Sequence, residues 1–256
     1  MVENSDLNGR LKEGLELHKK NKFIDALEIY KKILSEDPNH FETNFYMGTL
    51  LAQTKKFTEA SSHIIRAIKI KPEIAELHNN LGLIYRELNE FKKSLSCFEE
   101  AIKISPKFAL AHNNLGIVNW DLNNLEDAEK NFLKSVELNP VNSDPYNYLG
   151  LIYKTKDFEK AKYYFEECLK LNPKNYTVLN NLGNLYKNSG NAEISEKYFK
   201  EAISINKNYF DAYNNLMDLF DKTNQNNNFL NIINESKKIF NNNNIINLFY
   251  GLYLFK

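Results

Sequence analysis

The sequence predicts an all-α protein built from a repeated pair of helices, and three features carry this prediction. Glycines recur with a step of 34 residues, prolines recur with the same step, and small and aromatic residues recur between them at helical spacings. Self-similarity at a fixed period of this length is typical of helical repeat proteins, in which each repeat packs against its neighbours.

The glycines define the register of the repeat. The step is 34 residues except for a last step of 33: Gly14, Gly48, Gly82, Gly116, Gly150 and Gly183. The prolines follow the same pattern, including the short last step: Pro38, Pro72, Pro106, Pro140 and Pro173. One residue is therefore missing between Gly150 and Pro173, and we expect the deletion in the turn at residues 154–157.

Two amphipathic helices are predicted in each repeat. In the first helix a leucine precedes the glycine and an aromatic residue follows it, as in Leu81 and Tyr85. In the second helix a small residue is followed by an aromatic and by another small residue, as in Ser94, Phe98 and Ala101. Spacings of three and four residues place side chains on one helix face. Proline then ends the second helix, because it cannot continue one.

These columns resemble the tetratricopeptide repeat, a helix–turn–helix unit with this period. The resemblance covers residues 7–243 and implies a right-handed superhelical solenoid whose concave groove, lined by first helices, binds other proteins. A tail is expected at residues 1–6. Seven repeats are expected at residues 7–40, 41–74, 75–108, 109–142, 143–175, 176–209 and 210–243. The last repeat is degenerate because Met217 and Phe229 replace small residues, and asparagines within residues 224–228 are expected to lengthen its turn.

Residues 244–256 form an apolar C-terminal segment that we interpret as one further first helix, with Gly251 in register. A terminal helix of a repeat array should present a polar face to water, and this segment is apolar nearly all round. We therefore expect it to be covered. A second copy of the chain or a partner domain is one candidate, and the irregular seventh repeat is the other.

Side-chain amides are predicted to line the groove. With the glycine counted as the eighth place, helical spacing puts the fifth and ninth places, and the twelfth, on one face. Asparagines fill the fifth and sixth places of most repeats: Asn79, Asn80, Asn113, Asn114, Asn147, Asn180, Asn181, Asn214 and Asn215. The ninth and twelfth places add Leu83, Ile117, Trp120, Leu151 and Asn184. An amide offers both a donor and an acceptor, so this surface is predicted to hold the backbone of an extended peptide.

The same residues have alternative interpretations. Sixth-place asparagines can serve packing between repeats, and fifth-place asparagines can be a neutral choice copied by duplication. Trp120 can fill the core in place of the tyrosine missing at Asn119. The asparagine columns are also similar to those in the repeat arm of O-linked N-acetylglucosaminyltransferases. That resemblance implies a second possible function, the substrate-recognition arm of a glycosyltransferase that acts in trans or belongs to a longer chain.

Composition excludes several other classes. Lys+Arg and Asp+Glu both number 33, and a neutral chain is not expected to bind nucleic acid by neutralising phosphates, which also disfavours pentatricopeptide-like RNA recognition. The lysine and arginine positions with which chaperone adaptors bind a C-terminal carboxylate are also missing.

The sequence gives no sign of a membrane span, a metal site or a disulfide framework. No apolar stretch approaches the ~18–20 residues that cross a bilayer. No metal site is predicted, because His78 and His112 lack a third ligand. No cofactor or catalytic site is predicted, because the sequence has no phosphate loop, nucleophile elbow or His-Glu zinc motif. Cys97 and Cys168 are interpreted as structural thiols, which favours a cytoplasmic scaffold.

Overall fold

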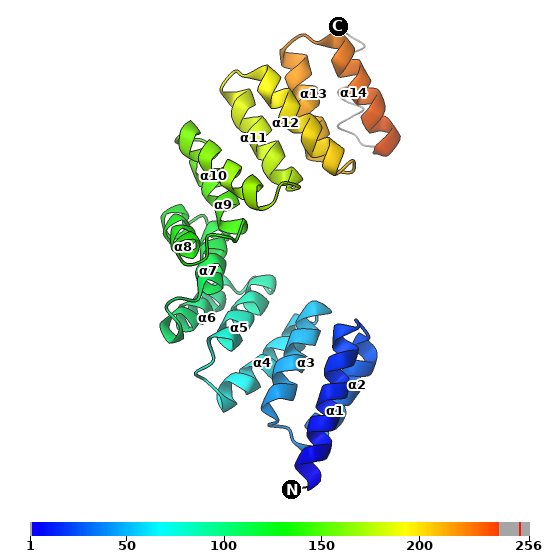
Figure 1. The fold of residues 1–256 in the computed structure, drawn as a ribbon, viewed down its shortest axis with the longest axis vertical. Coiled ribbons are helices and arrows are strands. Elements are labelled where there is room, and N and C mark those ends of the chain that lie inside the picture. Colours follow the sequence, from blue (N-terminus) through cyan, green and yellow to red (C-terminus); the bar gives the residue numbers. More distant parts are fainter. Residues whose placement is uncertain (1, 241–250, 252–256) are drawn as a thin grey trace. The chain divides into compact units, whose positions relative to one another are not determined.

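The structure, a computed structural model, describes residues 2–240 and Gly251. Fourteen α-helices and no strand are present in this described part (Figure 1), so the all-α prediction is confirmed. None of these helices combines the length and the apolar character needed to span a membrane. Apart from Gly251, the apolar segment predicted at residues 244–256 lies outside the described residues.

Each predicted repeat contains two helices. The first four repeats contain α1 (Val2–Lys19), α2 (Phe23–Glu36), α3 (Phe41–Gln53), α4 (Phe57–Ile70), α5 (Ala75–Glu87), α6 (Phe91–Ile104), α7 (Ala109–Asp121) and α8 (Leu125–Leu138). The other three contain α9 (Asp144–Tyr153), α10 (Phe158–Leu171), α11 (Tyr176–Asn188), α12 (Ala192–Ile205), α13 (Phe210–Lys222) and α14 (Asn226–Ile239).

The tail predicted at residues 1–6 is corrected by the structure, because α1 begins at Val2. No glycine or proline interrupts residues 2–6, so the helix can continue toward its N-terminus. Arg10 Nη2 lies 3.1 Å from Asp6 Oδ2 one turn earlier, and its guanidinium also binds Glu36 of α2. These ion pairs join the first turns of α1 to the rest of the repeat.

The turns inside the repeats share one backbone feature. Six of them contain a residue with positive φ: Asn21, Lys55, Asn89, Asn123, Gly190 and Asn224. The turn at residues 154–157 contains none, and α9 has 10 residues where α7 and α11 have 13, so the missing residue has removed this turn position. The lengthened turn expected at residues 224–228 is wrong, because α14 already begins at Asn226.

The helices form two compact stacks, one of α1 to α8 within residues 2–138 and one of α9 to α14 within residues 139–240. Within each stack the helices pack in sequence order (Figure 1). In the N-terminal stack, first helices also contact one another, α1 with α3, α3 with α5 and α5 with α7, and second helices make fewer such contacts. This stack therefore curves toward its first helices. We call the surface formed by the first helices of a stack its first-helix face.

The glycines lie where the two helices of a repeat approach most closely. A Cβ added at Gly82 would lie 2.7 Å from Phe98 Cε1, and one at Gly183 would lie 2.5 Å from Phe199 Cε1. Any side chain there would have to displace the buried ring. In the same repeat Ser94 Oγ donates a hydrogen bond of 2.7 Å to the Gly82 carbonyl. The glycine, small-residue and aromatic columns therefore form the core of each repeat.

Candidate functional site

Three of the predicted fifth-place asparagines are almost completely buried. Asn79 and Asn113 are 2% exposed and Asn180 is 5% exposed, whereas Asn147 and Asn214 are half-buried. Side chains buried to this degree offer little surface to a ligand. An unpaired buried polar group costs free energy. The amide oxygens of Asn79 and Asn180 each accept a hydrogen bond, whereas the buried Asn113 Oδ1 has no hydrogen-bond partner within the described residues.

Amide pairs join successive first helices. In each pair a sixth-place Nδ2 donates to the fifth-place Oδ1 of the preceding repeat: Asn114 to Asn79 at 2.9 Å, Asn181 to Asn147 at 3.3 Å and Asn215 to Asn180 at 2.9 Å. The two partners are 34 or 35 residues apart in sequence. These asparagines thus contribute to packing between repeats, which is one of the two roles that the sequence allowed.

Ion pairs join two of the same helix pairs. Arg86 Nε donates to Asp121 Oδ2 at 2.6 Å between α5 and α7, and Lys187 Nζ donates to Asp218 Oδ2 at 2.9 Å between α11 and α13. Burial raises the pKa of Asp218, but hydrogen bonds from Lys187 and Lys222 outweigh burial and hold the pKa of this carboxyl below its usual value. We call a junction with both an amide pair and an ion pair a closed junction.

The junction between α3 and α5 has neither contact. One repeat before Asn79 the fifth place is Phe45, and one repeat before Arg86 the twelfth place is Ala52. Neither side chain can accept a hydrogen bond or carry a positive charge. We call this the open junction.

Two polar residues of α5 are left without partners at the open junction. Asn80 and Glu87 occupy the places that Asn114 and Asp121 occupy on α7. Asn80 is half-buried and Glu87 is exposed, and neither makes a hydrogen bond or an ion pair within the described residues. The repeat geometry thus presents one amide and one carboxylate that no residue of α3 meets.

A mainly apolar hollow of about 190 Å³ lies between these helices. One side consists of Thr49, Ala52 and Gln53 from α3 with Phe57 from α4, and the other side consists of Asn80, Leu83, Ile84 and Glu87 from α5. Leu83 is 37% exposed. The hollow is smaller than the ~300–1,000 Å³ typical of sites for drug-sized ligands, so its size suits one side chain of a partner.

Sequence reasoning selected Asn80 and Leu83 for this site and did not select the residues contributed by α3 and α4. Thr49 and Ala52 occupy the ninth and twelfth places, which the helical spacing already assigns to the groove. Their small, uncharged side chains were the available signal. Phe57 begins α4 and carried no signal of a groove position.

The other predicted groove residues are half-buried. Ile117 and Trp120 lie on α7, Leu151 on α9 and Asn184 on α11. Asn184 Nδ2 donates to the Asn180 carbonyl at 3.2 Å, so its amide is bonded within its own helix. Trp120 keeps exposed surface, while Asn119 beside it is 6% exposed.

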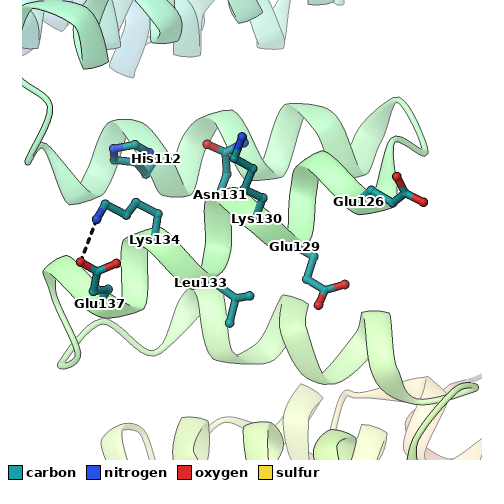
Figure 2. A pocket seen from close by; sticks show the side chains of 8 residues that line it. All are labelled: His112, Glu126, Glu129, Lys130, Asn131, Leu133, Lys134 and Glu137. Atoms are coloured by element: carbon teal, nitrogen blue, oxygen red, sulfur yellow. Dashed lines mark hydrogen bonds and ion pairs between the residues drawn. The ribbon is translucent and has the colours of Figure 1, made fainter.

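A wider hollow of about 650 Å³ adjoins α8 (Figure 2). Its side chains do not converge on one point, since Glu126 and Glu129 point away from His112. Lys134 Nζ donates to Glu137 Oε1 at 2.7 Å, and His112 Nε2 lies 3.1 Å from the Pro106 carbonyl oxygen. The charged groups are mixed in sign, so this hollow specifies no ligand chemistry.

The remaining titratable groups of interest serve the fold. His78 Nε2 lies 2.9 Å from the Pro72 carbonyl oxygen, the contact that His112 makes in the next repeat. Burial raises the pKa of the Cys97 thiol, and that of Cys168, to about 11, so both thiols stay protonated and weakly reactive at neutral pH. Among the described residues, no group of three His, Cys, Asp or Glu side chains could hold a metal ion.

Comparison with known families agrees with the repeat geometry. Two models of the tetratricopeptide repeat match residues 82–123 and 109–142. These matches support the tetratricopeptide repeat family. A further model, described as the TT21 fifth ARM repeats domain, matches residues 149–247. The matches do not show the closer likeness to glycosyltransferase repeat arms. No curated protein matches the chain.

Solved structures share the tetratricopeptide repeat fold. MamA is 25% identical with a TM-score of 0.58, and the match covers 63% of this chain and 95% of MamA. A tetratricopeptide repeat protein from Parabacteroides merdae is 15% identical with a TM-score of 0.71, covering 98% of this chain and 99% of that one. YrrB, described as a tetratricopeptide repeat protein with an unusual peptide-binding site, is 19% identical with a TM-score of 0.57, covering 72% and 95%. The last two likenesses show the fold alone.

Proposed function

We propose that this chain is a non-catalytic scaffold that binds an extended segment of a partner protein on the first-helix face of its N-terminal stack. The open junction between α3 and α5 carries this proposal, because there an apolar hollow adjoins an amide that no described residue engages. Tetratricopeptide repeat proteins generally act as such scaffolds, and YrrB is described as having a peptide-binding site.

The contacts available on this face suit a peptide in extended conformation. Asn80 can donate to, and accept from, a peptide backbone, while Leu83 and the hollow offer apolar area to a side chain. On α7 the half-buried Ile117 and Trp120 extend the apolar surface. Fewer asparagines are therefore proposed to contact the peptide than the sequence predicted. Four of them already form hydrogen-bonded pairs within the protein: Asn79 with Asn114 and Asn180 with Asn215. Cytoplasmic location and the lack of nucleic-acid or membrane partners stay predictions.

Site-specific photo-crosslinking tests the proposal. A photoreactive phenylalanine analogue at position 49, beside the hollow, is compared with the same analogue at position 24 on α2, where Ile24 is 77% exposed. We expect the full chain labelled at position 49 to crosslink a short segment of a partner protein in native lysate, identified by mass spectrometry. Equal crosslinking from both positions, or none from position 49, would contradict binding on the first-helix face.

A further inference from the structure

The contrast between the open and closed junctions specifies what a ligand must supply. On α7, Asn114 and Asp121 each meet a partner on α5. On α5, Asn80 and Glu87 occupy the same two places but face a repeat that has Phe45 and Ala52 in place of the partners. A ligand that replaces both missing partners would give α5 the contacts that α7 already has.

We propose that the open junction binds an extended peptide in which an apolar residue stands beside a lysine or arginine. This inference rests on the proposed function and adds the chemistry of the partner. A peptide carbonyl accepts a hydrogen bond from Asn80 Nδ2, replacing the missing fifth-place acceptor. The basic side chain pairs with Glu87, replacing the missing cation. The apolar side chain enters the hollow between Ala52 and Leu83.

Two side-chain oxygens of α3 at the hollow already have a polar contact. Thr49 Oγ1 donates to the Phe45 carbonyl at 2.9 Å, and Gln53 Oε1 lies 2.8 Å from His18 Nε2. An apolar side chain that enters the hollow therefore leaves the Thr49 hydroxyl and Gln53 Oε1 with the contacts that they already have. Because burial of apolar area is favourable and burial of an unpaired polar group is not, the hollow discriminates against a polar side chain.

Charge selects the neighbouring residue of the peptide. Glu87 lines the hollow, is exposed, and has no cationic partner within the described residues. Arg86, next to it in sequence, is bound to Asp121 of the following repeat. A basic residue would therefore pair with Glu87, whereas an acidic residue at the same point would meet a like charge. The pair is solvent-exposed, so it contributes more to selectivity than to total affinity.

Peptide selection on the full chain tests this inference. A phage-displayed random peptide library is selected on the wild-type protein, and the enriched consensus peptide is synthesised with a fluorescent label and capped ends. We expect the consensus to contain an apolar residue next to lysine or arginine. By fluorescence anisotropy, Leu83→Ala should weaken its binding about tenfold, and replacing its basic residue by glutamate should weaken it about fivefold.

Charge reversal provides the matched control. Glu87→Lys should remove the preference for the basic peptide over its glutamate version, whereas Glu99→Lys, at an exposed site on α6, should leave it unchanged. Both sites are exposed, so both variants are expected to fold, and circular dichroism checks this. Peptides that depend on Leu83 but show no basic preference would overturn this inference and leave the proposed function standing. Failure to enrich any peptide, or binding that is insensitive to Leu83, would contradict both.

Discussion

The two junctions that α5 makes with neighbouring first helices share the same repeat pattern but differ in their polar contacts. Toward α7, α5 presents Asn79 and Arg86, which bind an asparagine and an aspartate of the next repeat. Toward α3, α5 presents Asn80 and Glu87, at the places that the asparagine and the aspartate occupy on α7. At the facing places α3 has only Phe45 and Ala52. The first junction is closed by polar contacts, and the second leaves a hollow. In a repeat array, two substitutions on one helix can thus turn a packing contact into a candidate binding site.

The C-terminal stack supports this interpretation independently. The junction of α11 with α13 again has an amide pair, Asn180 with Asn215, and an ion pair, Lys187 with Asp218. The closed arrangement therefore occurs once in each stack. The open junction lacks both of its contacts.

The largest expected effect comes from removing the contact that positions α5 for both of its junctions. Phe98 is fully buried against Gly82, and Phe98→Ala should destabilise the protein by about 3–5 kcal/mol because it leaves a cavity. Tyr163→Ala, at a ring that is 55% exposed, should cost less than about 1 kcal/mol. Urea unfolding followed by circular dichroism measures both. Equal urea midpoints for the two variants would contradict the stabilising role assigned to the buried ring of Phe98.

Next in size is the difference between two sixth-place asparagines. Asn114→Ala should destabilise by about 1–3 kcal/mol, because it leaves the buried Asn79 Oδ1 without its donor. Asn80→Ala should change stability by less than about 0.5 kcal/mol, since Asn80 has no hydrogen-bond partner in the part of the chain that the structure describes. Comparison of urea midpoints for the two single variants distinguishes a closed from an open junction. Equal losses would mean that Asn80 also serves packing.

A smaller effect is expected from closing the open junction by design. Phe45→Asn supplies the acceptor that α3 lacks, and it should bring Asn80 into an amide pair. In a double-mutant cycle, Phe45→Asn and Asn80→Ala should then show a coupling free energy of about 1 kcal/mol. The apolar burial lost with Phe45 is common to both arms of the cycle and cancels. Purely additive effects would contradict the equivalence of the two junctions.

The smallest effect is a pH dependence of the closed junction between α11 and α13. The pKa of Asp218 is lower in the folded protein than its usual value, so the ionised carboxyl stabilises the fold above that usual value. This stabilisation should decrease as the pH falls through the lowered pKa, because the folded state then takes up the proton. Asp218→Asn should cost at most about 1 kcal/mol at neutral pH. The difference in stability between Asp218→Asn and wild type, measured by urea unfolding, should vanish in strong acid. An equal difference at neutral pH and in acid would contradict a stabilising role for the ionised Asp218 carboxyl.

Local sequence features predicted the helices well. The starts of α3, α5, α7, α11 and α13 coincide with the predicted starts of their repeats, because the glycine and proline columns fix the register of each helix pair. Two local expectations failed at Val2 and Asn226. At Val2 the helix continues because residues 2–6 contain no glycine or proline. At Asn226 the helix begins early because α14 buries Phe229 in the core of the C-terminal stack.

The sequence by itself determined the repeat, the helix pairs and the set of asparagines on the first helices, since these follow from a fixed period and from helical spacing. Only the tertiary structure decided which amides are used inside the protein. Asn79 and Asn80 are neighbours in sequence, yet one is bonded to the following repeat and the other faces a repeat that offers no acceptor. That outcome depends on the residue one repeat away that lies against each amide, because a hydrogen bond requires a partner within reach in space.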